Sequence, residues 1–229
     1  MFKNGILLSL AVFAILAFSS CAGENVLEKH LPAPLSYSPP PADFVELKDL
    51  IPGIVLDIRY ATTNNFMGKP LDGYKSERAF MLPEPAQALA RVQEELESMR
   101  YSLKIYDAYR PMRSELQMIQ WSRATGNEIF LRDGYLMSNI KPTNRFGHSS
   151  GNSVDLTIVD SSGLELDMGT QFDHFASSSW TANASGPVLK NRLLLKNLME
   201  KHGFRNFSRE WWHFNYWHAP HPPVDEEIQ

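Results

Sequence analysis

The 229-residue sequence contains a single cysteine, so no disulfide can form within the chain. The fold must therefore be held by packing, or by packing together with a bound metal. A strong charge of either sign is also lacking, because 22 basic side chains face 26 acidic ones. This balance and a hydrophobic content of 43% argue against disorder and against broad electrostatic capture of nucleic acid. We therefore expect a folded protein with no nucleic-acid partner.

The sequence has no apolar run of membrane-spanning length. The run over residues 6–18, broken only by Ser9, is shorter than the roughly 20 residues that a spanning helix needs. Lys3 precedes this run, as in an export signal, and two serines lead directly into Cys21, as in bacterial lipoprotein processing. We therefore predict a signal segment over residues 1–21, with lipidation of Cys21 as the only membrane anchor. Ordinary secretion with a free thiol is the alternative. The expected location is the periplasm or the cell surface.

The rest of the chain divides by composition. Residues 22–43 are rich in proline and poor in large apolar side chains, which favours a semi-rigid tether. The folded domain is expected over residues 44–219. Residues 220–229 combine proline with acidic side chains and are predicted to form a tail after the domain.

Hydrophobic periodicity in the folded part predicts both helices and strands. Leu89, Val92 and Leu96 recur at steps of three and four residues, the pattern of an amphipathic helix. Residues 153–160 alternate between apolar and polar side chains, the pattern of a strand. The predicted strands are 54–59, 103–105, 153–160 and 211–217, and the predicted helices are 83–100, 111–121 and 188–202. This irregular interleaving favours an α+β domain over a doubly wound parallel sheet.

Two separated segments carry residues suited to metal chemistry. His148 lies in a turn rich in glycine and serine, and Asp155 follows on the polar face of the next predicted strand. His213 lies in an aromatic segment with Glu210 three residues before it. Two histidines and one carboxylate are a plausible ligand set for a catalytic zinc ion. Glu210 would be the base, and we expect it in the turn before the strand, because residues 210 and 213 of one regular strand point to opposite faces. Taken singly, residues such as these three ligand candidates are more often ordinary loop or surface residues than metal ligands.

Several segments of the folded part, taken in order, resemble the D-alanyl-D-alanine dipeptidases of the vancomycin-resistance type, which are zinc enzymes within the peptidoglycan DD-peptidases. The resemblance extends from about residue 54 to residue 217. The matching segments are Arg59-Tyr60-Ala61-Thr62, Asn65-Phe66, Gly68-Lys69-Pro70, Asp72-Gly73-Tyr74, Asp107-Ala108-Tyr109-Arg110-Pro111, His148 through Asp155-Leu156-Thr157, Met168-Gly169-Thr170, Phe172-Asp173 and Glu210-Trp211-Trp212-His213.

The resemblance implies a fold, a cofactor and roles for particular residues. The implied fold is a small, mostly antiparallel sheet flanked by helices, the hedgehog-like fold of zinc DD-peptidases, with one zinc ion per chain. The implied roles are zinc ligation by His148, Asp155 and His213, general base catalysis by Glu210, transition-state stabilisation by Arg110, and substrate contacts from Tyr60 and Asp173. One departure stands out: the family usually has serine two residues before the first ligand histidine, where this chain has Phe146. Recognition of the substrate carboxylate is the feature that this departure affects.

Simpler roles are open for three of these residues. Arg110 could merely pair with Asp107, Tyr60 could merely pack in the core, and Asp173 could cap a turn. For the whole protein, the resemblance favours hydrolysis of D-Ala-D-Ala or a related D,D-dipeptide. The alternatives are a D,D- or L,D-carboxypeptidase acting on peptidoglycan stem peptides and a non-catalytic, lipid-tethered protein that binds the cell wall.

Overall fold

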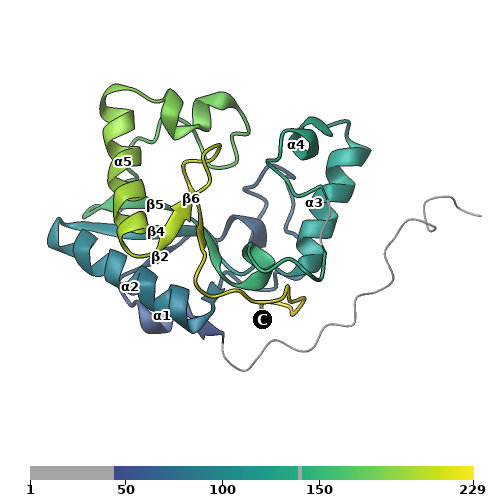
Figure 1. Ribbon diagram of the computed structural model, residues 1–229, viewed down its shortest axis with the longest axis horizontal. Helices are drawn as coiled ribbons and strands as arrows, with labels where there is room; N and C mark the ends of the chain where they lie inside the picture. Colours follow the sequence, from purple (N-terminus) through teal and green to yellow (C-terminus); the bar gives the residue numbers. More distant parts are fainter. Residues whose placement is uncertain (1–43, 139–140) are drawn as a thin grey trace, which may run out of the picture. The chain divides into compact units, whose positions relative to one another are not determined.

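The computed structural model describes residues 44–138 and 141–229, which belong to one compact unit (Figure 1). The predicted signal segment, Cys21 and the predicted tether lie outside the described residues. Within the described ranges, no helix has the combination of length and apolar character required to cross a bilayer.

Helices and short strands alternate irregularly along the chain. The strands are β1 (Val45–Glu46), β2 (Val55–Leu56), β3 (Phe80–Met81), β4 (Tyr101–Asp107), β5 (Ser153–Asp160), β6 (Phe204–Asn206) and β7 (His213–Tyr216). The α-helices are α1 (Leu47–Leu50), α2 (Pro83–Ser98), α3 (Met112–Ala124), α4 (Ile129–Arg132) and α5 (Gly186–Lys201). Four 3-10 helices are described: η2 (Arg59–Ala61), η3 (His148–Ser150), η4 (Ser177–Ser179) and η5 (Thr181–Asn183).

The central sheet has five strands in the order β2-β4-β5-β7-β6. Strand β2 runs parallel to β4, and the other neighbouring pairs are antiparallel. A separate antiparallel pair is formed by β1 and β3. The chain is therefore an α+β protein with a small, mostly antiparallel sheet, as the sequence predicted.

Two long helices support the sheet. Helix α2 begins at Pro83, where a missing backbone N–H costs nothing, and its apolar stripe at Leu89, Val92 and Leu96 is fully buried. It packs against β4 and α5, and α5 packs against β6 (Figure 1). The two helices thereby fix the strands from which the polar side chains of the site project. In Figure 1, helices α3 and α4 lie together on the right of the view, whereas α5 lies on the left.

Strand β5 is the part of the sheet that separates core from site. Val154, Leu156 and Ile158 are fully buried in the hydrophobic core, as the alternating pattern predicted. Asp155 therefore points to the opposite face. Its partner across the β4 ladder is Asp107, at a point where the register shifts after Ile105. This irregularity allows the end of β4 to leave the regular sheet, and the chain then runs through Arg110 into α3.

The last ten residues differ from the expectation of a tail. Val224 and Ile228 are buried in the core, and Ile228 forms a parallel bridge with Tyr74. Asp225 and Glu227 pair with Arg113 at the start of α3. Residues 220–229 are therefore part of the folded domain. Val224 and Ile228 are buried in the hydrophobic core, and Asp225 and Glu227 form ion pairs with Arg113.

Candidate active site

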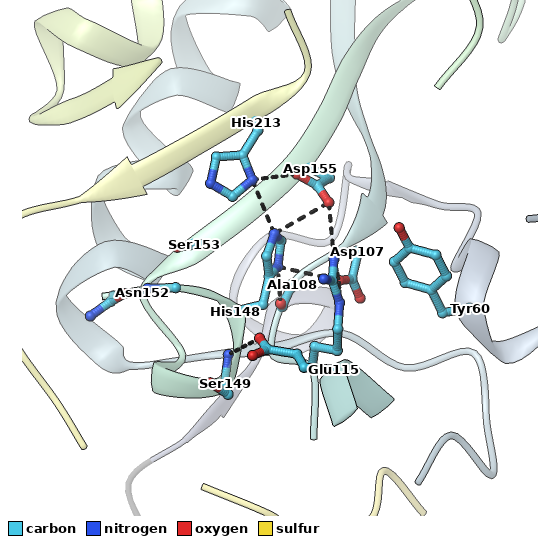
Figure 2. Close-up of polar contacts among 12 residues, drawn as sticks. Tyr60, Asp107, Ala108, Glu115, His148, Ser149, Asn152, Ser153, Asp155 and His213 are labelled. Carbon is cyan, nitrogen blue, oxygen red and sulfur yellow. Dashed lines mark hydrogen bonds and ion pairs between the residues drawn. The ribbon is translucent and has the colours of Figure 1, made fainter. Parts of the chain in front are cut away.

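The structure brings His148, Asp155 and His213 to one point (Figure 2). One ligand atom from each of the three lies within 4.8 Å of the others. His148 Nε2 is 3.2 Å from Asp155 Oδ2, and His213 Nδ1 is 2.9 Å from Asp155 Oδ1. The two imidazole nitrogens are themselves 3.2 Å apart. Two nitrogen donors and one carboxylate therefore face a common centre, which is a donor set that suits zinc.

Backbone geometry places these three side chains. Asp155 on β5 is the direct partner of His213 on β7, so their side chains leave the same face of the sheet as neighbours. His148 lies in η3, between Gly147 and Gly151, whose φ angles are 131° and 69°. Such angles are readily adopted by glycine, and they let the turn fold back over the end of β5. A side chain at Gly151 would in addition collide with the ring of Phe44.

The ring of His148 is held by its second nitrogen. His148 Nδ1 lies 2.6 Å from the carbonyl oxygen of Ala108, so it carries the proton and leaves Nε2 free to face Asp155. Burial would by itself raise the pKa of Asp155, but the neighbouring His148 and His213 outweigh burial and hold this pKa below its usual range. Asp155 is accordingly an ionised carboxylate at neutral pH, as a metal ligand must be.

The guanidinium of Arg110 is held by the buried carboxylate of Asp107. Its Nε donates to Asp107 Oδ2 at 2.8 Å, and its terminal nitrogen lies 3.4 Å from Asp155 Oδ2. Tyr74 donates its hydroxyl to Asp107 Oδ1 at 2.5 Å, and the guanidinium lies over the ring of Tyr60 at 4.7 Å. The simple pairing with Asp107 is therefore present. It also holds the guanidinium at the edge of the pocket, which Arg110 lines.

Glu210 precedes β7, in the turn where the sequence predicted it. Its side chain is buried and lines the same pocket as His148, Asp155 and His213. Burial, followed by the negative charges of Asp155 and Asp173, raises the pKa of the Glu210 carboxyl well above its usual range. A carboxyl group held in this way has a strong tendency to take up a proton.

Tyr60 and Asp173 lie together at another part of the pocket. The Tyr60 hydroxyl is 3.1 and 3.0 Å from the two carboxylate oxygens of Asp173. Asp173 has a φ of 60°, an uncommon conformation for a residue other than glycine. Tyr60 is buried, as expected for a packed residue, and both side chains also line the pocket.

The pocket has a volume of about 350 Å³ and two unlike sides. We call the residues His148, Asp155, Glu210 and His213 the sheet side. The other side is largely apolar and comes from α3, α4 and the chain that follows them. We call it the helix side, and its residues are Met118, Ile119, Leu131 and Leu136. Phe146 also lines the pocket, and the centroid of its ring lies 4.3 Å from that of Trp217, the residue directly after β7.

Three polar residues of the site were not assigned from the sequence. Asp107 occurs in a segment quoted for the resemblance, and its position three residues before Arg110 was a usable signal. Asn215 falls on the same side of β7 as His213 by simple alternation. Glu115 gave no signal, because a single acidic residue on a helix is usually a surface residue. In the structure it is buried, lines the pocket and accepts from the Ser149 N–H at 3.3 Å.

The chain is similar to known proteins over most of its length. A family model described as D-ala-D-ala dipeptidase matches residues 41–229. A D-alanyl-D-alanine dipeptidase of Enterococcus faecium is 31% identical over 193 residues, which cover 78% of this chain and 94% of that protein. The corresponding protein of Streptomyces coelicolor is 34% identical over 202 residues, 79% of this chain and 94% of the relative. The D-alanyl-D-alanine dipeptidase of Escherichia coli K12 is 32% identical over 184 residues, which cover 80% of this chain and 89% of that protein.

The chain also resembles solved structures. One match is a vancomycin resistance D,D-dipeptidase, VanXYg, in complex with a D-Ala-D-Ala phosphinate analogue. It has a TM-score of 0.37 and 15% sequence identity, and the match covers 76% of this chain and 66% of that one.

Proposed function

Because the chain belongs to the D-Ala-D-Ala dipeptidase family, whose model matches residues 41–229, we propose that it hydrolyses D-Ala-D-Ala or a closely related D,D-dipeptide with one zinc ion per chain. The observation that carries this proposal is the convergence of His148, Asp155 and His213 in the pocket that Glu210 also lines. The relatives share the activity in their names, and this chain spans most of their length.

The metal would be held by His148 Nε2, the Asp155 carboxylate and His213 Nδ1, the atoms that face the common centre. When bound in a three-ligand site, zinc polarises a carbonyl group and lowers the pKa of water to about 7. Glu210 has the position and the raised pKa of a group that takes a proton from the attacking water and passes it to the leaving amine.

Arg110 and the pair of Asp173 and Tyr60 account for the two remaining needs of the reaction. Attack on the amide places negative charge on the carbonyl oxygen, and the guanidinium of Arg110 stabilises that charge from a position fixed by Asp107. Burial, followed by the negative charge of Asp155, raises the pKa of the Asp173 carboxyl well above its usual range, and the free ammonium group that every unmodified dipeptide carries would favour its ionised form at the pocket wall. The Tyr60 hydroxyl holds the Asp173 carboxylate in place.

The proposal is tested by incubating the purified chain with D-Ala-D-Ala and measuring the D-alanine released. Release is expected to stop when a chelator removes the metal and to return when zinc is added. A folded, zinc-loaded sample that is inert towards every D,D-dipeptide would overturn the proposal. A pentapeptide stem, assayed beside the dipeptide, distinguishes a carboxypeptidase, which would prefer the longer substrate.

Export and lipidation complete the proposal, and they rest on the sequence of residues 1–21 alone. An enzyme anchored through Cys21 outside the cytoplasm would act on dipeptides released from the cell wall rather than on cytoplasmic precursors. Metabolic labelling with a fatty acid is expected to mark the wild-type chain and to leave Cys21→Ala unmarked. Labelling of both chains, or of neither, would contradict lipidation at this residue.

A further inference from the structure

His213 makes a second contact on the side of its ring that faces away from the metal centre. Its Nδ1 faces His148 and Asp155, and its Nε2 lies 2.9 Å from the side-chain nitrogen of Asn215. The other end of the Asn215 amide, Oδ1, lies 2.5 Å from the hydroxyl of Ser153. Ser153 on β5 and Asn215 on β7 are direct partners across the ladder. A continuous hydrogen-bonded chain therefore runs from Ser153 through Asn215 to His213.

This chain can run in either direction. A hydroxyl both donates and accepts, and a half-turn of the asparagine amide exchanges its oxygen and its nitrogen with little change of shape. In the orientation observed, Asn215 donates to Nε2 of His213, so the ring proton is on Nδ1 and is donated to Asp155 Oδ1 at 2.9 Å. In the reverse orientation, Asn215 Oδ1 accepts a hydrogen bond from the Nε2–H of His213, and the Asn215 side-chain nitrogen donates to the Ser153 hydroxyl.

The reverse orientation is the one that a metal requires. A ring nitrogen that coordinates a metal carries no proton, so the proton of His213 must then be on Nε2 and needs an acceptor. We infer that Asn215 is a positioning residue of the metal site, which supplies this acceptor to His213 and takes its own fixed orientation from Ser153. The inference rests on the proposed function, because it presupposes that His213 is a ligand.

The two histidines thus differ in how they are held. His148 Nδ1 faces the carbonyl oxygen of Ala108, which can only accept, so one tautomer is fixed at all times. His213 faces an amide that satisfies either tautomer. An aspartate at position 215 would serve only the tautomer that binds metal, and a leucine of similar size would serve neither. Ser153 is fully buried, so the hydroxyl that orients the amide does not exchange its partner for bulk water.

The experiment measures zinc affinity directly. The full-length chain in mild detergent is stripped of metal, and its dissociation constant for Zn²⁺ is measured by competition with a chromogenic chelator. Asn215→Leu is expected to weaken binding by about 10- to 100-fold, the usual cost of losing the outer partner of a ligand histidine. Asn215→Asp keeps the acceptor and is expected to bind within about threefold of wild type. The melting temperatures of the metal-free variants serve as the control for a merely structural role.

Two results would overturn the inference: binding by a folded Asn215→Leu within threefold of wild type, or binding by Asn215→Asp as weak as that of the leucine variant. If Asn215→Leu does not fold, Asn215→Ala is measured in its place against Asn215→Asp under the same criteria. A wild-type chain that binds no zinc would instead defeat the proposed function. The two failures are therefore distinguishable.

Discussion

The two sides of the pocket are built by different means. On the sheet side, Asp155 and His213 are direct partners across one antiparallel ladder, and His148 is held by a backbone carbonyl. On the helix side, the lining comes from α3, the four-residue helix α4 and Leu136, and it offers mainly apolar surface. The three donors that could hold a metal are thus positioned by β5, β7 and the turn before β5, whereas the helix side has the character of a surface that selects substrates.

This contrast predicts that substitutions on the sheet side abolish turnover and that those on the helix side change preference. The largest effect is expected for Glu210→Gln, which preserves shape but removes the base. Its kcat for D-Ala-D-Ala should fall by about 10²- to 10⁴-fold. Zinc content measured by elemental analysis should be unchanged, because the three convergent donors do not include Glu210. An active variant, or one that loses its zinc, would show that the role of this residue is different.

Arg110→Lys is expected to have the next largest effect. Lysine keeps the positive charge beside the buried Asp107 but loses the planar fork, so kcat should fall by about 100-fold while the protein stays folded. The matched control is Arg113→Lys, because Arg113 pairs with Asp225 and Glu227 and does not line the pocket. If kcat fell equally in the two variants, the loss would reflect a disturbed fold and not a role of Arg110 in the reaction.

Phe146→Ser tests another apolar part of the pocket lining, beside Trp217. Removal of the ring takes apolar surface from the pocket and introduces a small hydroxyl, the side chain that the family usually has at this position. The ratio of kcat/KM for D-Ala-D-Leu to that for D-Ala-D-Ala should fall by about 10-fold, with kcat for D-Ala-D-Ala little changed. Leu164→Ser, at a side chain that is 70% exposed, is the control for a general effect of the substitution. If the ratio of the two kcat/KM values did not change, Phe146 would have no role in selecting the substrate.

The smallest effect on turnover is expected for Ile228→Ala. This side chain is buried at the far end of the chain, and its segment pairs with Tyr74, which donates to Asp107. The free energy of unfolding should fall by about 2–5 kcal/mol, as for other buried isoleucines, in a denaturant titration. Turnover of the folded fraction should change less than threefold. A large loss of turnover would show that the C-terminal segment holds the sheet side in place.

Local patterns predicted much of the fold. Apolar spacing located α2, and alternation located β5, because both signals come from residues close in sequence. The burial of residues 220–229 could not be predicted in this way. Proline and acidic residues dominate that segment, and the burial of Val224 and Ile228 depends on a core surface formed by distant residues. The composition of a segment does not predict which distant residues of the fold it packs against.

The three candidate metal ligands were predictable from the sequence, whereas Glu115 and the contacts between the site residues were not. Spacing does not reveal that β5 pairs with β7, so the convergence of Asp155 and His213 came from the resemblance rather than from local rules. The Arg110 pairing with Asp107 was foreseeable at a separation of three residues. The contact of Asn215 with His213 required knowing which ring nitrogen faces outward, and that depends on the tertiary structure.

The most direct test of the central claim is anomalous diffraction at the zinc absorption edge from crystals of the zinc-loaded protein. The account predicts one peak per chain, roughly 2.0–2.2 Å from His148 Nε2, an Asp155 carboxylate oxygen and His213 Nδ1. A peak at another place in the chain, or an ion bound without any one of these three side chains, would contradict it.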